Sequence, residues 1–129
     1  PLARAMAADG GRRFVAMSMA TDTNVYVAVA EPERVVTGGE TFRRVCASCH
    51  GMEGGGGVGP NLTDDYWLHG SDMTAVTKTI KYGWPSKGMQ AWRGLLKEDE
   101  ILEVASFVMT LKGTNVSGGI APQGELVTQ

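Results

Sequence analysis

Cysteine and histidine are scarce in this chain of 129 residues, which has two of each. A structural zinc site needs four protein ligands, so it would consume all of them. Long apolar runs are also missing, because the run from Phe14 to Ala20 is far short of the roughly 20 residues that span a bilayer. The formal net charge of −2 argues against a general nucleic-acid binder.

Residues 14–30 alternate larger and smaller side chains on either side of a turn. Val25, Val27 and Val29 follow a period of two, and the Thr-Asp-Thr-Asn stretch at 21–24 supplies turn chemistry. The pattern predicts a β-hairpin within an N-terminal extension over residues 1–34. Because a lone hairpin is marginal in water, we expect it to pack on the main body.

Three capping signals predict helices further along the chain. Thr37 and Glu40 fit a capping box, which predicts a helix beginning near Gly38. Thr63 and Ser71 are candidate caps of two more helices. The helix after Ser71 carries apolar residues at helical spacing, and a glycine at position 83 is expected to end it.

The last helix has the clearest signal. Acidic residues fill its first turn at 98–100, and an apolar stripe then runs to Leu111. We therefore place the main domain at 35–112. The tail at 113–129 has no periodicity, which predicts irregular structure or a strap over the surface.

Cys46, Cys49 and His50 form a C-x-x-C-H motif, the spacing of covalent c-type haem attachment. Two thiols one helical turn apart can each add to one vinyl group of a haem. The adjacent histidine then lies beneath the ring with a nitrogen aimed at iron. A helix that presents Gly38, Phe42 and Cys46 at four-residue steps would lead into this motif.

Three other interpretations of the motif compete with haem attachment. A zinc site would need His69 beside His50, and His69 has no second ligand at zinc-finger spacing. A thioredoxin-like dithiol expects a βαβ pattern, which is missing. A disulfide across two residues would be strained and would close too short a loop to stabilise the chain. We therefore favour one covalent haem.

From Gly38 to about Leu111 the chain resembles a class I cytochrome c. Gly38 and Phe42 precede the first cysteine as in the family's first helix, and Phe107 matches the aromatic residue of its last helix. The resemblance implies that these two helices cross. It implies a mainly α, class I cytochrome c fold around one haem c, to which the hairpin-like extension and the irregular tail are added.

The Gly-Pro-Asn-Leu stretch at 59–62 is similar to a loop of that family. In the family, the proline carbonyl accepts a hydrogen bond from the proximal histidine, so the resemblance implies that Pro60 orients His50. Such a bond fixes the histidine tautomer and strengthens the imidazole as a donor to iron. A simple turn is the alternative interpretation of Pro60.

Met89 is our candidate for the second axial ligand of the iron, with His69 as the alternative. Residues 89–92, Met-Gln-Ala-Trp, are similar to the Met-Pro-Ala-Trp stretch of the haem domains in C-type haem-copper oxidases, with Gln90 in place of proline. Methionine and histidine ligation raises the potential, which suits an electron carrier. The remaining candidates lie on predicted apolar helix faces, too near His50, or in the hairpin: Met73, Met109, Met52, Met17 and Met19.

Residues 61–67 also resemble those oxidase haem domains, more closely than they resemble mitochondrial cytochromes. Tyr66 and Trp67 are candidates for the haem edge, where a phenol or indole N–H would bond a propionate or water. Ordinary core packing is the simpler interpretation of Tyr66. We expect Trp67, Trp84 and Trp92 to form walls of the haem pocket.

The resemblance implies an electron carrier rather than an enzyme, because an iron held on both faces has no vacant position for a substrate. Single electrons would pass from a quinol-oxidising respiratory complex to a terminal oxidase. Haem attachment through thiols implies export to a bacterial periplasm or its membrane face. No export signal is visible at Pro1, so we allow for a removed signal or membrane anchor.

Two alternatives keep the haem but change its use. The chain resembles a haem domain cut from an oxidase subunit, although the N-terminal hairpin favours a stand-alone protein. A weakly bound Met89 would instead make it a haem sensor or a peroxidase.

The segment between Asp72 and Glu98 has basic residues and no acidic one. It flanks the Met89 loop, so the resemblance implies positive charge at the haem edge where redox partners dock, with Lys87 and Arg93 nearest. An ordinary solvated helix face is the alternative for Lys78 and Lys81.

Overall fold

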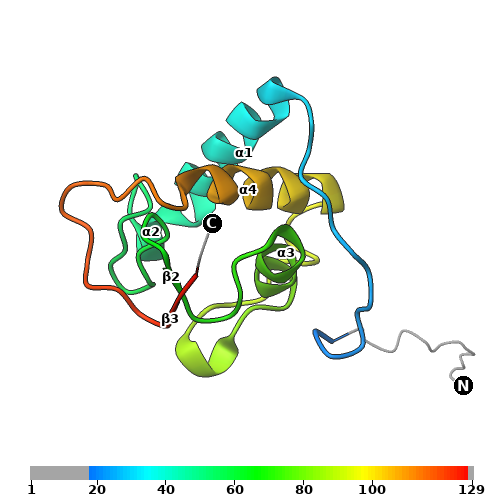
Figure 1. Cartoon of the computed structure of the whole chain (residues 1–129). Helices are drawn as coiled ribbons and strands as arrows, with labels where there is room; N and C mark the ends of the chain where they lie inside the picture. The colour runs from blue at the N-terminus through cyan, green and yellow to red at the C-terminus, as the bar shows by residue number, and fades with distance from the viewer. Residues whose placement is uncertain (1–17, 128–129) are drawn as a thin grey trace, which may run out of the picture.

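Two long helices cross at the centre of the molecule, and a third packs beside them (Figure 1). The computed structural model describes residues 18–127. Within this part of the chain the elements are α1 (Pro32–Val45), α2 (Ala47–His50), β2 (Tyr66–Trp67), α3 (Met73–Tyr82), the 3-10 helix η1 (Pro85–Lys87), α4 (Glu98–Leu111) and β3 (Glu125–Leu126).

The crossing of α1 and α4 depends on a close backbone approach at Gly38. A Cβ atom at this position would collide with the backbone carbonyl of Glu103 in α4. One turn further along α1, the rings of Phe42 and Phe107 pack with centroids 5.4 Å apart. The crossing that the family resemblance implied is therefore confirmed.

Helix α1 begins earlier than the capping-box signal predicted. Pro32 occupies its first turn, where the fixed φ of proline suits a helix and its missing N–H costs nothing, and Glu33 follows. Thr37 lies inside the helix, and its hydroxyl donates to the carbonyl of Glu33 at 3.0 Å. The predicted start near Gly38 is wrong because the proline signal lies upstream of it.

Helix α3 ends at Gly83 as predicted, but its cap is Asp72 rather than Ser71. A side-chain oxygen of Asp72 accepts a hydrogen bond from the backbone N–H of Ala75 at 2.8 Å. No helix begins at Thr63, because residues 64–72 contain none. Its hydroxyl instead donates to the side-chain oxygen of Asn61 at 2.7 Å, which holds a tight turn before β2.

Helix α4 matches its prediction, with an acidic first turn and a buried apolar stripe. This stripe meets residues of α1, of α3 and of the loop before α4 to form the core of the described molecule. The buried apolar residues are Phe42, Val76, Ile80, Leu96, Ile101, Val104, Ala105 and Val108. No helix within residues 18–127 is both long enough and apolar enough to cross a membrane.

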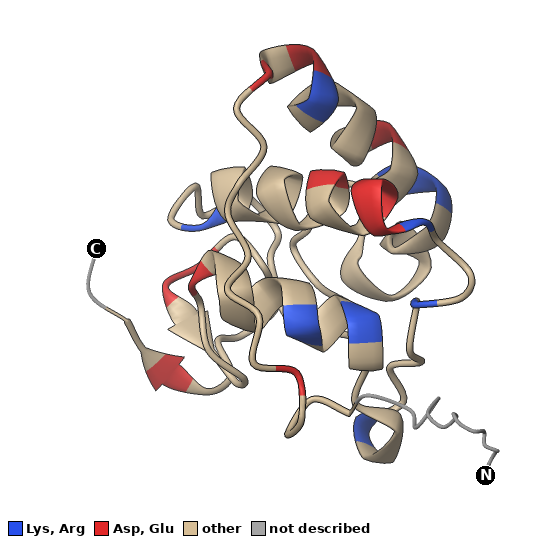
Figure 2. Ribbon diagram, turned by 90° about the vertical axis from the view of Figure 1, so that its right-hand side faces the viewer, with Lys and Arg blue, Asp and Glu red and all other residues tan. Residues whose placement is uncertain are grey.

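The predicted N-terminal hairpin is absent from the described residues 18–31, and its first residues, 14–17, lie outside them. Residues 18–31 form a strap that opens with a turn and then runs extended over α3 and α4 (Figure 2). The backbone N–H of Tyr26 donates to the Thr74 hydroxyl of α3, and that of Val29 donates to the Ser106 hydroxyl of α4, each at 3.0 Å.

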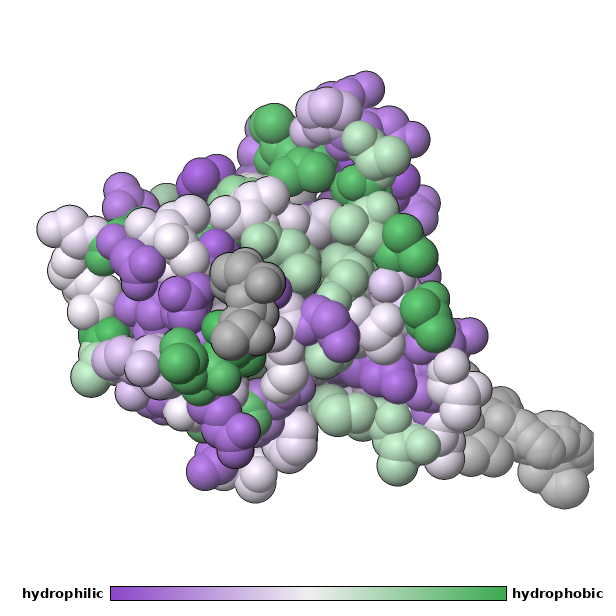
Figure 3. Space-filling model, viewed as in Figure 1, coloured by the Kyte–Doolittle hydropathy of each residue, from purple (hydrophilic) through white to green (hydrophobic). Residues whose placement is uncertain are grey.

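The alternation that suggested a strand is nevertheless present in the strap. Val25 and Val27 are 79% and 75% exposed, whereas Tyr26 between them is turned toward the helices. Apolar patches accordingly line the edge of the molecule where the strap runs (Figure 3). Hydroxyl groups of two helices take the place of a partner strand. The alternating pattern therefore predicted an extended segment correctly, but the predicted pairing with a second strand was wrong.

The C-terminal tail lies across the glycine-rich loop at the surface, which is one of the two forms that its sequence predicted. The backbone N–H of Ile120 donates to the carbonyl of Gly55 at 2.9 Å, and that of Asn115 donates to the carbonyl of Thr63 at 2.8 Å. The tail then forms β3, which pairs antiparallel with β2. This two-residue ladder was not predicted.

Candidate functional site

A cavity of about 650 Å³ lies between α1, α3, α4 and the connecting loops. Its volume falls within the range of about 300–1,000 Å³ that small-molecule and cofactor sites occupy. The C-x-x-C-H residues and Met89 line the same space. Its apolar wall comprises Phe42, Val45, Leu62, Val76, Ile80, Val104 and Val108.

The two cysteines lie one turn apart where α1 passes into α2. Cys46 closes α1 with a backbone hydrogen bond to Phe42 at 2.8 Å, and both thiols are free and partly buried. Burial, assisted by the neighbouring Cys49, raises the pKa of the Cys46 thiol to about 11. A redox-active dithiol requires a lowered thiol pKa, so the geometry disfavours that alternative.

The ring of His50 is fixed by the loop that follows the motif. Its Nδ1 lies 3.0 Å from the carbonyl oxygen of Pro60. Because a carbonyl only accepts, this bond requires the proton on Nδ1, which leaves Nε2 as an unprotonated donor for a metal. Burial lowers the pKa of His50, and the bond to Pro60 opposes this only in part, so the neutral ring is favoured.

Backbone contacts of the glycine-rich loop hold this arrangement. The N–H of Gly56 donates to the carbonyl of His50, and the N–H of Gly59 donates to the carbonyl of Cys49, each at 2.7 Å. A Cβ atom on Gly59 would lie 2.7 Å from the His50 ring. A side chain at position 59 would therefore push the ring away from its place.

Met89 is the one methionine among the described residues that lines the cavity. Met73 and Met109 pack against the core, as their helix faces predicted, and Met52 is largely exposed. His69 also lines the cavity, where its ring stacks on Trp84 with centroids 3.8 Å apart. Burial and the nearby Lys87 lower the pKa of His69.

All three tryptophans that the sequence analysis assigned to the haem pocket line the cavity. The indole nitrogens of Trp67 and Trp84 are buried and have no hydrogen-bond partner within the described residues. Buried donors of this kind are normally paired, and the carboxylates of haem propionates would accept from them. Tyr66 is 36% exposed at the cavity rim, so the core interpretation of Tyr66 is wrong.

The residues therefore fit a haem: two free thiols one turn apart, an oriented imidazole, an apolar wall and two unpaired indole donors. The zinc alternative lacks support, because no group of three or more His, Cys, Asp or Glu side chains within residues 18–127 is placed to hold a metal ion. The stacking of His69 on Trp84 could not be predicted from the sequence, because the two residues lie in different loops, 15 positions apart.

The basic segment is only partly a solvated surface. Lys87 and Arg93 are exposed, but Lys81 is 9% exposed and donates to the hydroxyl of Tyr26 at 2.8 Å. Its ammonium also lies 3.3 Å from a carboxylate oxygen of Glu98. Lys81 therefore does not belong to the exposed face on which the sequence placed it.

The fold and the cysteine–histidine motif define a class I cytochrome c domain, and comparisons with known proteins agree. Residues 33–108, more than half of the chain, match the family model described as "Cytochrome C oxidase, cbb3-type, subunit III". The chain belongs to this family. The cofactor of such a domain is one covalently bound haem c, which the two cysteines of the chain match.

Curated relatives include the cbb3-type cytochrome c oxidase subunit FixP of Rhizobium etli, 36% identical over 102 residues. This match covers 72% of the chain and 36% of the relative. The subunit CcoP of Rhodobacter capsulatus is 38% identical over 96 residues, covering 65% of the chain and 31% of that protein. The chain thus spans about a third of the length of these relatives.

Solved structures with a similar fold are cytochromes cL. That of Methylophaga aminisulfidivorans superposes with a TM-score of 0.59 at 29% identity, covering 64% of this chain and 56% of that one. The cytochrome cL of Hyphomicrobium denitrificans superposes with a TM-score of 0.53 at 30% identity, covering 58% of this chain and 45% of that one.

Proposed function

We propose that this cytochrome c domain carries single electrons on a haem whose iron His50 and Met89 would hold. The observation that carries this proposal is that Met89 lines the same cavity as Cys46, Cys49 and His50. The haem, when bound, supplies a one-electron couple between ferric and ferrous iron. All other roles below belong to side chains of this chain.

Each side chain has a distinct task in this proposal. Cys46 and Cys49 would form the thioether links to a haem, and Pro60 holds the imidazole of His50 in one tautomer and orientation. Trp67 and Trp92 line the cavity and would exclude water from a bound haem, and the unpaired indole N–H of Trp67 would be available to a propionate. Ligands held in place in both oxidation states keep the reorganisation that accompanies electron transfer small.

The proposed partners are redox proteins: a quinol-oxidising complex as donor and a terminal oxidase as acceptor, at the periplasmic face of a bacterial membrane. Two relatives are named as subunits of cbb3-type oxidases, which supports an oxidase as acceptor. Lys87 lines the cavity and is exposed, and Arg93 is exposed in the same loop region, so both are placed to guide docking.

A second candidate is that the chain works as the haem domain of an oxidase subunit rather than as a separate carrier. The observation that favours it is the coverage, since the chain matches about a third of each of these oxidase subunits. The size of the natively produced polypeptide, measured by mass spectrometry, would distinguish the two.

The proposed ligation is tested with Met89→Leu and the matched control Met109→Leu, which removes a methionine packed against the core. We expect the ferric wild type and the control to show the far-red band of sulfur bound to iron, and the ferrous forms to resist carbon monoxide. Met89→Leu should lose the band and bind carbon monoxide. A band that survives in Met89→Leu would overturn the proposal. A wild type that lacks the band and resists carbon monoxide would favour His69 ligation, whereas one that lacks the band and binds carbon monoxide would favour a sensor or a peroxidase.

A further inference from the structure

The strap carries a buried carboxylate that binds the end of α3. Asp22 is 1% exposed, and one of its oxygens accepts hydrogen bonds from the hydroxyls of Tyr26 and Tyr82, at 2.6 and 2.8 Å. The ammonium of Lys81 lies 3.7 Å from the same oxygen. Burial alone would raise the pKa of Asp22, but hydrogen bonds from Tyr26, Asn24 and Tyr82 outweigh it and hold the pKa well below its usual range.

The residue after Tyr82 starts the loop that presents Met89. The N–H of Trp84 donates to the carbonyl of Met89 at 2.8 Å, and the N–H of Met89 donates back to Trp84 at 3.1 Å. Gly83 has a φ of +66°, and a Cβ there would lie 2.5 Å from the backbone carbon of Gln90. The start of the loop and the Met89 backbone are thus in direct contact.

The far end of the loop returns to the same turn of α3. The N–H of Trp92 donates to the carbonyl of Ile80 at 3.0 Å, and the N–H of Arg93 donates to the carbonyl of Lys81 at 3.2 Å. The guanidinium of Arg93 lies over the ring of Tyr82, 5.2 Å from its centroid. Both arms of the Met89 loop therefore rest on the last turn of α3, to which Asp22 is bonded.

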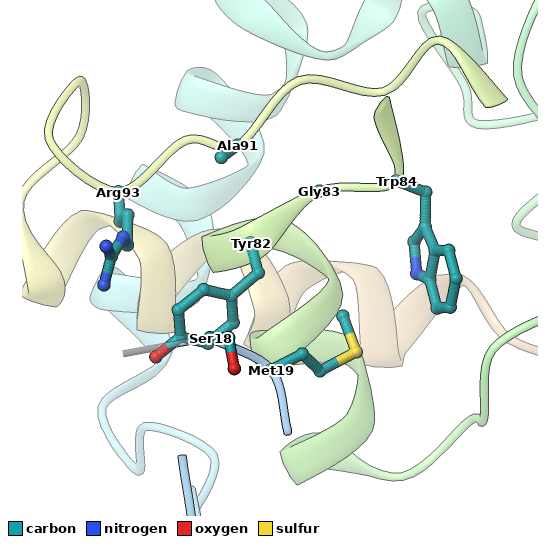
Figure 4. A pocket seen from close by; sticks show the side chains of 7 residues that line it. All are labelled: Ser18, Met19, Tyr82, Gly83, Trp84, Ala91 and Arg93. Atoms are coloured by element: carbon teal, nitrogen blue, oxygen red, sulfur yellow. The ribbon is translucent and has the colours of Figure 1, made fainter. Parts of the chain in front are cut away.

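A recess separate from the large cavity lies where the strap meets the Met89 loop, and residues of both line it. Met89 and Trp92 line the large cavity, whereas Ala91 and Arg93 face a separate recess of about 400 Å³. Figure 4 shows the residues that line it, with Tyr82 and Met19 below the chain of Gly83 and Trp84. No residue of the C-x-x-C-H motif lines this recess.

We propose that the Asp22–Tyr82 contact is a latch: it fastens the strap to the last turn of α3, and so positions Met89 on the iron. This inference rests on the proposed axial role of Met89. Asp22 and Tyr82 are positioning residues, because they act on Met89 through the backbone of the loop.

The latch is tested with Tyr82→Phe, which removes one hydroxyl and keeps the ring beneath Arg93, and with Asp22→Ala. The matched control is Ser106→Ala, which loosens the strap at Val29, away from the Met89 loop. Exogenous imidazole is titrated into each ferric holoprotein, and the far-red band is followed. Imidazole competes with Met89, so its apparent affinity reports the fraction of open loop.

We expect the apparent affinity for imidazole to rise about tenfold in Tyr82→Phe, by the usual strength of a hydrogen bond to a buried charge, and less than about twofold in Ser106→Ala. Equal affinities in wild type and Tyr82→Phe, with the band present in both, would overturn the latch while leaving Met89 ligation intact. Equal rises in Tyr82→Phe and the control would also overturn it. A wild type without the band would instead refute the proposed function.

Discussion

Asp22 shows how one buried charge can connect a terminal segment to a distant loop. Its carboxylate is almost completely buried, yet it stays ionised because two phenol hydroxyls, the Asn24 side chain and a backbone N–H all donate to it. Lys81 lies close by and has two further acceptors of its own, Tyr26 and Glu98. Satisfied networks of this kind hold a single arrangement, because an unpaired member would be costly.

The stability that Asp22 contributes should depend on pH. Its pKa in the folded protein lies below the unfolded value of about 3.9, so its contribution is complete above roughly pH 5 and declines as the pH falls below about 4. We expect Asp22→Asn to lower the free energy of unfolding by about 2 kcal/mol at pH 7, and by less at pH 3. Urea titrations of the holoprotein at both values measure this.

Asp99→Asn, at an exposed acidic residue in the first turn of α4, provides the control. Asp99→Asn should lower the free energy of unfolding at pH 7 by less than Asp22→Asn does. A difference between wild type and Asp22→Asn that stays the same from pH 7 to pH 3 would contradict the assignment of a low pKa to Asp22.

At the scale of elements, the crossing of α1 and α4 places the haem motif. The close approach at Gly38 and the ring contact between Phe42 and Phe107 fix α1 against α4. Cys46 closes α1, so the position of the first thiol follows from this crossing. A shift of α1 along α4 would carry the whole motif with it.

Gly38→Ala should therefore destabilise the holoprotein, although alanine favours a helix interior over glycine by about 1 kcal/mol. The added methyl group would collide with the backbone of Glu103, and overpacking typically costs about 1–3 kcal/mol. Thermal unfolding of the holoprotein measures this loss of stability. Thr37→Ala, at an exposed position of the same helix, should be neutral or stabilising, and a Gly38→Ala variant as stable as that control would contradict the tight crossing.

At the scale of the whole molecule, the helices differ in the sign of their charges. Helix α1 carries both signs and α4 has an acidic first turn, whereas α3 carries lysines and no acidic residue (Figure 2). Lys81 of α3 is buried and bonded to Tyr26 and Glu98. Lys87 and Arg93 are therefore the exposed cations of the predicted docking segment that lie in the region of the Met89 loop.

Charge reversal at these positions should slow electron transfer with an acidic redox protein. We expect Lys87→Glu, and separately Arg93→Glu, to lower the second-order rate constant by about threefold to tenfold at low salt, because complementary charge raises encounter rates. The difference should fade as salt screens the surface charges. Stopped-flow mixing at several ionic strengths measures the rate.

Arg44→Glu makes the same change of charge on the exposed end of α1, where the residue does not line the cavity. It should leave the rate nearly unchanged. Equal effects of Lys87→Glu and Arg44→Glu would show that net charge, rather than the Met89 loop, governs the encounter.

The sequence by itself determined the features that depend on a few neighbouring residues. The spacing of Cys46, Cys49 and His50 places two thiols and an imidazole within about one helical turn, whatever surrounds them. The end of α3 at Gly83 and the acidic first turn of α4 are likewise local, and the structure has them where the sequence predicted. The apolar face of α4 follows from its 3.6-residue period.

The tertiary structure alone decided which distant groups meet. The period of two in residues 25–29 identified an extended segment, but its partners are the hydroxyls of Thr74 and Ser106, far along the chain. The sequence predicts Lys81 to be a surface lysine of α3, but in the structure the strap places Asp22 and Tyr26 beside it. Local patterns set the conformation and the exposed or buried side of a segment, whereas its partners depend on how all elements pack together.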